Sequence, residues 1–165
     1  MLIQTTALAA VVAAAVLFVP SESAIRDGTT GPLSGVGAAP SLQAQTLDDA
    51  TIVAIFDAAN TADIETGKLA AKQGASSEVR AFGAMLVHDH EQVRQMGRDL
   101  AKKLGVTPAP PADDAGARAH AEAMTRLSAL SGAAFDQAFL AHEVSFHATV
   151  ISAINTTLMP AIKNA

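Results

Sequence analysis

Two histidines and two neighbouring carboxylates fall on the apolar faces of the helices that this sequence predicts, and they are the groups best suited to chemistry. On the second predicted helix, His90 lies about 40° to one side of the centre of the apolar stripe and Asp89 about 60° to the other side, at 3.6 residues per turn. On the last predicted helix, Glu143 and His147 are one turn apart within an inward apolar stripe, which is made of Phe139, Leu140, Val150 and Ile154. All four side chains are therefore expected to face inwards.

Buried carboxylates and imidazoles destabilise a fold unless they pair with each other or bind a metal ion. One interpretation is a hydrogen-bonded core, in which an imidazole donates to a nearby carboxylate. A second is a pH-sensing or partner-binding role for the two histidines. A third is a metal site for Fe, Mn or Zn, which imidazole and carboxylate ligands suit. Its predicted ligands are Glu65, His90, Glu143 and His147, with Asp89 as a further ligand or as a group that orients an imidazole.

The remaining polar residues are placed by the same helical phase. Asp63 lies nearer the centre of the first helix's apolar stripe than Glu65, which lies at its flank and is the residue included in the predicted site. His88 lies opposite the stripe of its helix and is expected to be solvated. His120 and His142 have no placement that favours function, and both are predicted to lie at the surface.

Apolar residues that recur every three or four positions predict the helices that carry these groups. Asp48, and either Ser76 or Ser77, stand where N-caps belong, and Gly74 and Gly105 stand where helices end. Because only two or three residues join the first two helices, these helices must form an antiparallel hairpin. No alternating strand pattern occurs, so the predicted fold class is all-α. The predicted helices span about residues 48–73, 77–104, 117–130 and 133–156, with a proline-rich crossover after the second.

A short pattern occurs twice in the chain. Residues 81–90 and 138–147 share Ala, Phe, Ala, Val and His in the order A-F-x-A-x-x-V-x-x-H. The repeat suggests a duplicated helical hairpin. A bundle of two such hairpins would bring the helices that carry His90 and His147 together across its centre.

Composition excludes several classes of protein. The net charge is −5, only 16% of the residues are charged and Trp and Tyr are absent, so nucleic-acid binding is not expected. The absence of cysteine excludes disulfides, a thiol nucleophile, iron–sulfur clusters and cysteine-ligated zinc. A chain rich in Ala and poor in aromatic residues suits closely packed helices.

The N-terminal segment has the pattern of an exported protein. The apolar run of residues 7–19 is short for a transmembrane helix and fits the apolar region of a signal peptide. We expect a signal peptide over residues 1–23, with an N-terminal anchor as the alternative. Residues 24–46 are rich in Gly, Ser and Pro and predict a flexible linker, so the folded domain is expected at 47–165. The expected location is the periplasm or the outer membrane surface.

Several segments resemble a bacterial ferritin-like family of unknown function, whose members are often called putative outer membrane proteins. They are residues 56–60, 65–70, 79–83 with 85–90, and 130–132 with 135–136. The resemblance covers about 47–165 and implies an exported, ferritin-like antiparallel helical bundle. Members carry another long helix after the segment that matches 158–165. The resemblance thus implies a bundle without its last helix, with an exposed apolar groove and self-association through it.

The predicted function is that of an exported envelope protein with a binding or structural role, and catalysis is not favoured. No Gly-x-Ser-x-Gly turn and no phosphate-binding glycine loop occurs. The alternative is a metal-binding or metal-dependent redox protein that uses the His and carboxylate site. Ferritin-style di-iron chemistry is not expected, because Val87 and Val144 stand where its Glu-x-x-His motifs require glutamate.

Overall fold

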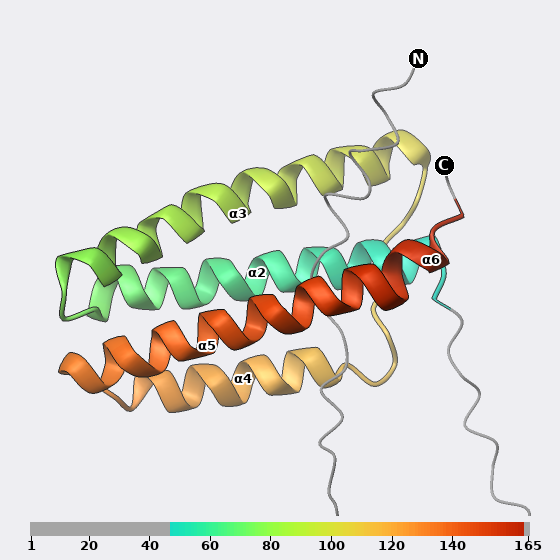
Figure 1. Cartoon of the computed structure of the whole chain (residues 1–165). Helices are drawn as coiled ribbons and strands as arrows, with labels where there is room; N and C mark the ends of the chain where they lie inside the picture. Colours follow the sequence, from blue (N-terminus) through green and yellow to red (C-terminus); the bar gives the residue numbers. More distant parts are fainter. Residues whose placement is uncertain (1–46, 164–165) are drawn as a thin grey trace, which may run out of the picture.

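The computed structural model describes residues 47–163, and they form a bundle of four long helices (Figure 1). No strand occurs in this part of the chain, so the predicted all-α antiparallel bundle is confirmed. The predicted signal peptide and linker lie outside the described residues. The helices are α2 (Asp49–Gln73), α3 (Ser77–Leu104), α4 (Ala115–Ser128) and α5 (Gly132–Ala153), followed by the π-helical turn η1 (Ile154–Leu158) and the short α6 (Met159–Ala161).

The helix ends follow the capping residues in the sequence. The Asp48 side chain accepts a hydrogen bond from the Thr51 N–H at 2.8 Å, and Ser76 accepts one from the Val79 N–H at 3.2 Å. Gly105 ends α3 in the left-handed conformation, with φ of 69°. The predicted bounds of the four helices are therefore close to the observed ones, although the last helix passes into η1 before its predicted end. Among the helices of residues 47–163, none combines the length and the hydropathy that crossing a membrane requires.

Contacts between the helices fix their directions. The Phe82 and Phe139 rings lie 5.9 Å apart, as do the His90 and His147 rings, so α3 and α5 run in parallel. These are the equivalent positions of the sequence repeat. The prediction that the two histidine-bearing helices face each other is thus confirmed.

The connection between α3 and α4 stays at one end of the bundle. Within it, the Ala109 N–H donates to the Ala50 carbonyl at 3.1 Å, beside the start of α2 (Figure 1). The four helices therefore alternate in direction along the chain. This alternation establishes the antiparallel bundle. Ferritin-like bundles contain a long crossover, which the described residues lack, so the relation to ferritin-like proteins stays a prediction. The predicted absence of a last helix also stays a prediction.

Asp136 joins the second hairpin to the first. Its two carboxylate oxygens accept hydrogen bonds from the Ala75 and Ser76 N–H groups at 2.8 and 2.9 Å. These backbone hydrogen bonds hold the pKa of Asp136 below its usual value. Phe135, its neighbour, is fully buried. Packing therefore explains Phe135, and the contact with the α2–α3 turn explains Asp136.

The helices α2 and α3 approach each other very closely at two glycines. A Cβ atom added to Gly83 would lie 2.6 Å from the Gly67 carbonyl oxygen, and one added to Gly67 would lie 2.7 Å from the Gly83 carbonyl oxygen. Only glycine fits at either position without moving a helix. This contact sets the distance between the two helices.

Apolar clusters fill the two ends of the bundle, and a polar layer separates them. Ile52 packs with Leu158 at one end, and Ala59 packs with Val150 further along. The other end holds a larger cluster contributed by all four helices, made of Ala70, Val79, Leu86, Leu127, Phe135 and Phe139. Leu140, which the sequence placed in the inward stripe of the last helix, is 44% exposed. That expectation is wrong.

Candidate metal centre

Three side chains from three helices meet in the polar layer between the apolar clusters. They are Asp63 of α2, His90 of α3 and His147 of α5, and one ligand atom from each lies within 4.8 Å of the others. Asp63 Oδ2 is 3.4 Å from His90 Nδ1, and Asp63 Oδ1 is 3.9 Å from His147 Nε2. Glu143 adds a second carboxylate, with Oε2 3.7 Å from His147 Nδ1.

The two carboxylates of this cluster are buried without enough hydrogen-bond donors. Asp63 is 2% exposed and Glu143 is 3% exposed. Asp63 Oδ1 and both Glu143 oxygens have no hydrogen-bond partner among the described residues. The nearby Thr66 hydroxyl has a single proton to donate and lies 3.2 Å from the backbone carbonyls of both Ala62 and Asp63. Buried polar atoms without partners are rare and costly, so these three oxygens call for a proton, a bound water or a cation.

Burial changes the ionisation of the site. Burial, and to a smaller extent the neighbouring Glu143 carboxylate, raises the pKa of Asp63 to about 8. Burial also raises the pKa of Glu143. The pKa of His90 is lowered, first by burial and then by the nearby His147. The site therefore favours a neutral His90 ring and a carboxylate that keeps its proton at neutral pH unless a cation replaces it.

Hydrogen bonds fix which ring nitrogen of each histidine carries the proton. His147 Nδ1 lies 2.9 Å from the Glu143 backbone carbonyl, which only accepts, so Nδ1 donates. Asn60 Nδ2 donates to the Phe56 carbonyl at 2.9 Å, which leaves Asn60 Oδ1 to accept from His90 Nδ1 at 2.9 Å. A neutral ring then keeps the lone pair on Nε2. Such bonds from the other ring nitrogen are typical of metal-binding histidines.

Two of the predicted ligands lie outside this cluster. Glu65 is exposed, and its Oε2 atom lies 2.7 Å from His120 Nε2. Asp89 is also exposed, although its helical phase predicted an inward position. The structure brings together His90, Glu143 and His147 from the predicted set, and it adds Asp63. The signal for Asp63 was present in the sequence, because it lies nearer the centre of the stripe than Glu65.

His120 and His142 are not the surface residues that the sequence predicted. Both are partly buried. His120 binds Glu65, and the His142 ring stacks on Phe146 with the centroids 5.8 Å apart. Burial lowers the pKa of His142, with a smaller contribution from His120. His88 is exposed and pairs with Gln92, as its phase predicted.

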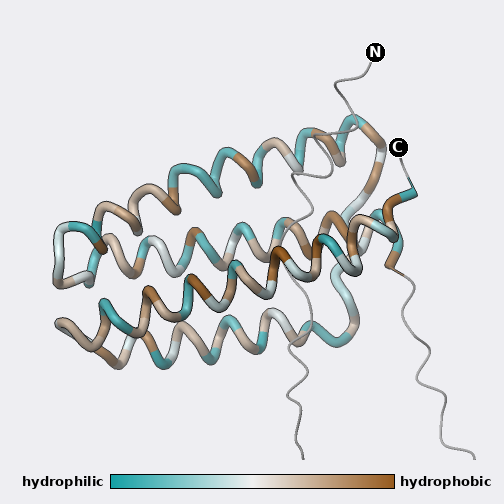
Figure 2. The backbone as a smooth tube through the Cα atoms, viewed as in Figure 1, coloured by the Kyte–Doolittle hydropathy of each residue, from teal (hydrophilic) through white to brown (hydrophobic). Residues whose placement is uncertain are grey.

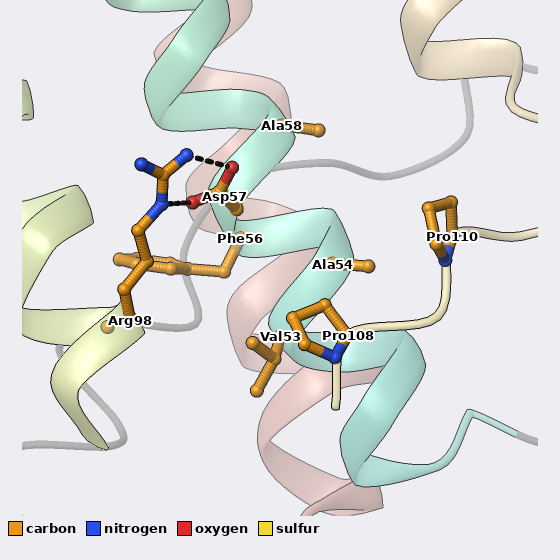
Figure 3. Close-up of a pocket in the computed structure, with 9 residues that line it drawn as sticks. Val53, Ala54, Phe56, Asp57, Ala58, Arg98, Pro108 and Pro110 are labelled. Carbon is orange, nitrogen blue, oxygen red and sulfur yellow. Dashed lines mark hydrogen bonds and ion pairs between the residues drawn. The ribbon is translucent and has the colours of Figure 1, made fainter. Parts of the chain in front are cut away.

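A separate cavity of about 350 Å³ lies between α2, α3 and the connection that follows α3 (Figure 3). Arg98 and Asp57 form a two-point ion pair at this cavity, with Arg98 Nη2 2.9 Å from Asp57 Oδ2. Their charges therefore satisfy each other. The cavity is lined by Val53, Ala54, Phe56, Asp57, Ala58, Gly97, Arg98, Pro108 and Pro110.

Comparisons with known proteins identify a family and no activity. No curated protein and no solved structure matches the chain. One family model matches residues 34–165, which is most of the chain, and its description is a domain of unknown function, DUF4142. The chain therefore belongs to the DUF4142 family.

Proposed function

We propose that this protein binds one divalent transition-metal ion in the middle of its helical bundle. Asp63, His90 and His147 supply the ligands, and the Glu143 carboxylate, which lies beside His147 outside this group of three, would hold a water bound to the ion. The observation that carries the proposal is the pair of buried carboxylates whose oxygens lack donors beside two imidazoles. A cation in this position would satisfy those oxygens directly.

A hydrogen-bonded core explains the same residues less well. In such a core, the imidazole and hydroxyl donors would point at the carboxylates. Here His147 donates to a backbone carbonyl, and so does Thr66. His90 Nδ1 is 2.9 Å from Asn60 Oδ1 and 3.4 Å from Asp63 Oδ2, so its shorter contact is to the amide. These donors are thus directed mainly at backbone and amide oxygens, while Asp63 Oδ1 and both Glu143 oxygens lack a hydrogen-bond partner among the described residues. The Thr66 hydroxyl is near enough to Glu143 to lower the pKa of that carboxylate, but burial raises it by more.

The ligand set indicates the class of ion. Two imidazoles with one or two carboxylates are typical of Zn²⁺ and of mononuclear non-haem Fe²⁺, and Mn²⁺ also accepts such ligands. The chain has no cysteine, so copper and zinc sites built on thiolates are excluded. We propose metal binding as the function and assign no catalytic residue. Metal-dependent redox activity is the alternative if the ion is iron.

Titration calorimetry of metal-free, untagged protein tests the proposal. We expect one Zn²⁺, Fe²⁺ or Mn²⁺ per chain, and a loss of at least about 100-fold in affinity in His90→Ala and in His147→Ala, since both are ligands. Affinity should also fall as the pH drops below about 8, because the ion must displace the proton that the buried Asp63 carboxylate keeps, and protonation of the imidazoles at lower pH should weaken binding further.

The matched control is His88→Ala, which removes an exposed histidine from the same helix as His90. It should bind metal as the unmodified protein does. Absence of binding for all three ions, or equal binding in the variants without His90 or His147, would contradict the proposal.

We also propose that the protein is exported and acts in the bacterial envelope. The apolar run of residues 7–19 and the small residues that follow it support this location, and so does the resemblance to exported proteins called putative outer membrane proteins. We propose kinship with ferritin-like bundles on the same resemblance. Mass spectrometry of protein from the envelope of the native host should find a chain that begins near Ala24. Recovery of only full-length protein from the cytoplasm would end the export proposal.

A further inference from the structure

The outward face of α5 is apolar along much of its length. Leu140 is 44% exposed, Val144 is 73% exposed and Ile151 is 54% exposed. At about 100° per residue, these three side chains fall within an arc of about 40° on the helix. They form one stripe that points away from the core, and we call it the outer stripe of α5.

The outer stripe lacks the charges that normally surround exposed apolar residues. No Lys or Arg occurs anywhere in Gly132–Ala153, and Figure 2 shows hydrophobic stretches recurring along this helix. The two acidic residues of α5 are Asp136, which accepts from the α2–α3 turn, and Glu143, which is buried. Exposed positions beside the stripe are uncharged, with Gln137 towards the start of the helix and the small Ala141 and Ala148 further along.

The helix α3 provides the contrast within the same molecule. It also exposes large apolar side chains, with Met85 at 50% and Met96 at 58%. Charged or polar residues accompany them, since Arg98, Asp99 and Gln95 are exposed close to Met96. Exposure of a single apolar residue among charges is ordinary, whereas an uncharged apolar stripe is typical of an interface.

We propose that the outer stripe of α5 is the contact surface for a second copy of this chain. The chain carries 16 acidic and 11 basic residues, a net charge of −5, so acidic surfaces of two copies repel each other more often than oppositely charged surfaces meet. A two-fold contact places the same patch of each copy against itself. An uncharged, apolar patch is the kind of surface that can meet itself without placing like charges together.

The spacing of the stripe sets the register of this contact. In an antiparallel, two-fold pairing of α5 helices, Leu140 of each copy meets Ile151 of the other, and the axis passes between residues 144 and 147. The small flanking alanines allow the helices to approach closely. His147, whose side chain is 38% exposed, lies at the edge of this face. The second copy would therefore cover the open side of the polar layer, although the proposal does not depend on a bound metal.

Analytical ultracentrifugation tests the proposal directly. The unmodified protein should change from monomer to dimer as its concentration rises, and Val144→Glu should stay monomeric with unchanged helix content by circular dichroism. The control is Met96→Glu on α3, which places the same charge at an exposed apolar residue and should still form dimers. A monomer at every concentration, or equal dimer formation in Val144→Glu, would overturn the proposal.

Cross-linking tests the register, because the chain contains no cysteine of its own. Val144→Cys lies close to the predicted two-fold axis and should form a disulfide-linked dimer under mild oxidation. Met96→Cys places a thiol at another exposed apolar position, outside the predicted contact, and should give little cross-linked product. Cross-linking of both variants to the same extent would show random collision and would overturn the predicted contact.

Discussion

Replacing Asp63 by asparagine is expected to stabilise the metal-free protein near neutral pH while it abolishes stabilisation by metal ions. The folded-state pKa of Asp63 is about 8, whereas its value in the unfolded chain is near the usual 3.8. The folded state thus holds a proton that the unfolded state releases, so stability falls as the pH rises from about 4 to about 8. Asparagine does not titrate, and we expect Asp63→Asn to gain about 2 kcal/mol at pH 8.

The measurement is urea or thermal unfolding in the presence of a chelator, above about pH 6.5. Below about pH 6.5, His90 makes the stability rise with pH instead, because its pKa is lower in the folded state and the unfolded chain then binds a proton that the folded chain does not. Added metal at about 100 times its dissociation constant should stabilise the unmodified protein by about 2.7 kcal/mol and leave Asp63→Asn unchanged.

Asp89→Asn is the matched control for this experiment, because Asp89 is an exposed carboxylate that neighbours His90 in sequence. It should alter neither the unfolding free energy nor the effect of metal. If Asp63→Asn is instead less stable than the unmodified protein under chelation, Asp63 is a hydrogen-bonded structural group. That result would contradict the metal site.

The sequence predicted the helices well because their ends are encoded locally. Asp48, Ser76 and Gly105 each form the cap that their residue types favour. The repeat of Phe and His also predicted correctly that equivalent positions of α3 and α5 meet. These features depend on neighbouring residues or on a repeated pattern, and neither requires knowledge of the packing.

The choice between Asp63 and Glu65 depends on packing that the sequence does not encode locally. The helix α2 contacts α3, α4 and α5, and its buried residues occur on several sides. A helix buried on several sides has no single inward stripe, so helical phase alone does not select the residue that faces the site. Asp89 was misplaced for the related reason that α3 buries only a narrow face.

The two apolar faces of α5 explain the wrong placement of Leu140. One face holds Phe139 and Val150 and packs into the core, and the other is the outer stripe. Periodicity reports that a residue is apolar, and it does not report which apolar face meets the core. The exposure of Leu140 therefore depends on how α5 packs against the other helices, which the periodicity of α5 does not encode.

Replacing Gly83 by alanine is expected to destabilise the fold more than replacing Gly105 does, and to weaken metal binding as well. The added Cβ would lie 2.6 Å from the Gly67 carbonyl oxygen and 2.7 Å from the Ala71 backbone nitrogen. Both neighbours are backbone atoms of α2, so the helices must separate. We expect a loss of about 2 kcal/mol, which is the cost of overpacking less the better helix propensity of alanine.

The link to metal binding follows from the position of this contact. Asp63 lies one turn from Gly67 on α2, and His90 lies two turns from Gly83 on α3, so separating the helices moves the His90 ring away from the Asp63 carboxylate. The control is Gly105→Ala, where φ is 69° and no atom lies within 4 Å of the added Cβ. It should lose about 1 kcal/mol from backbone strain and keep its metal affinity. If Gly83→Ala and Gly105→Ala change the unfolding free energy and the metal affinity to the same extent, the α2–α3 contact does not position the site.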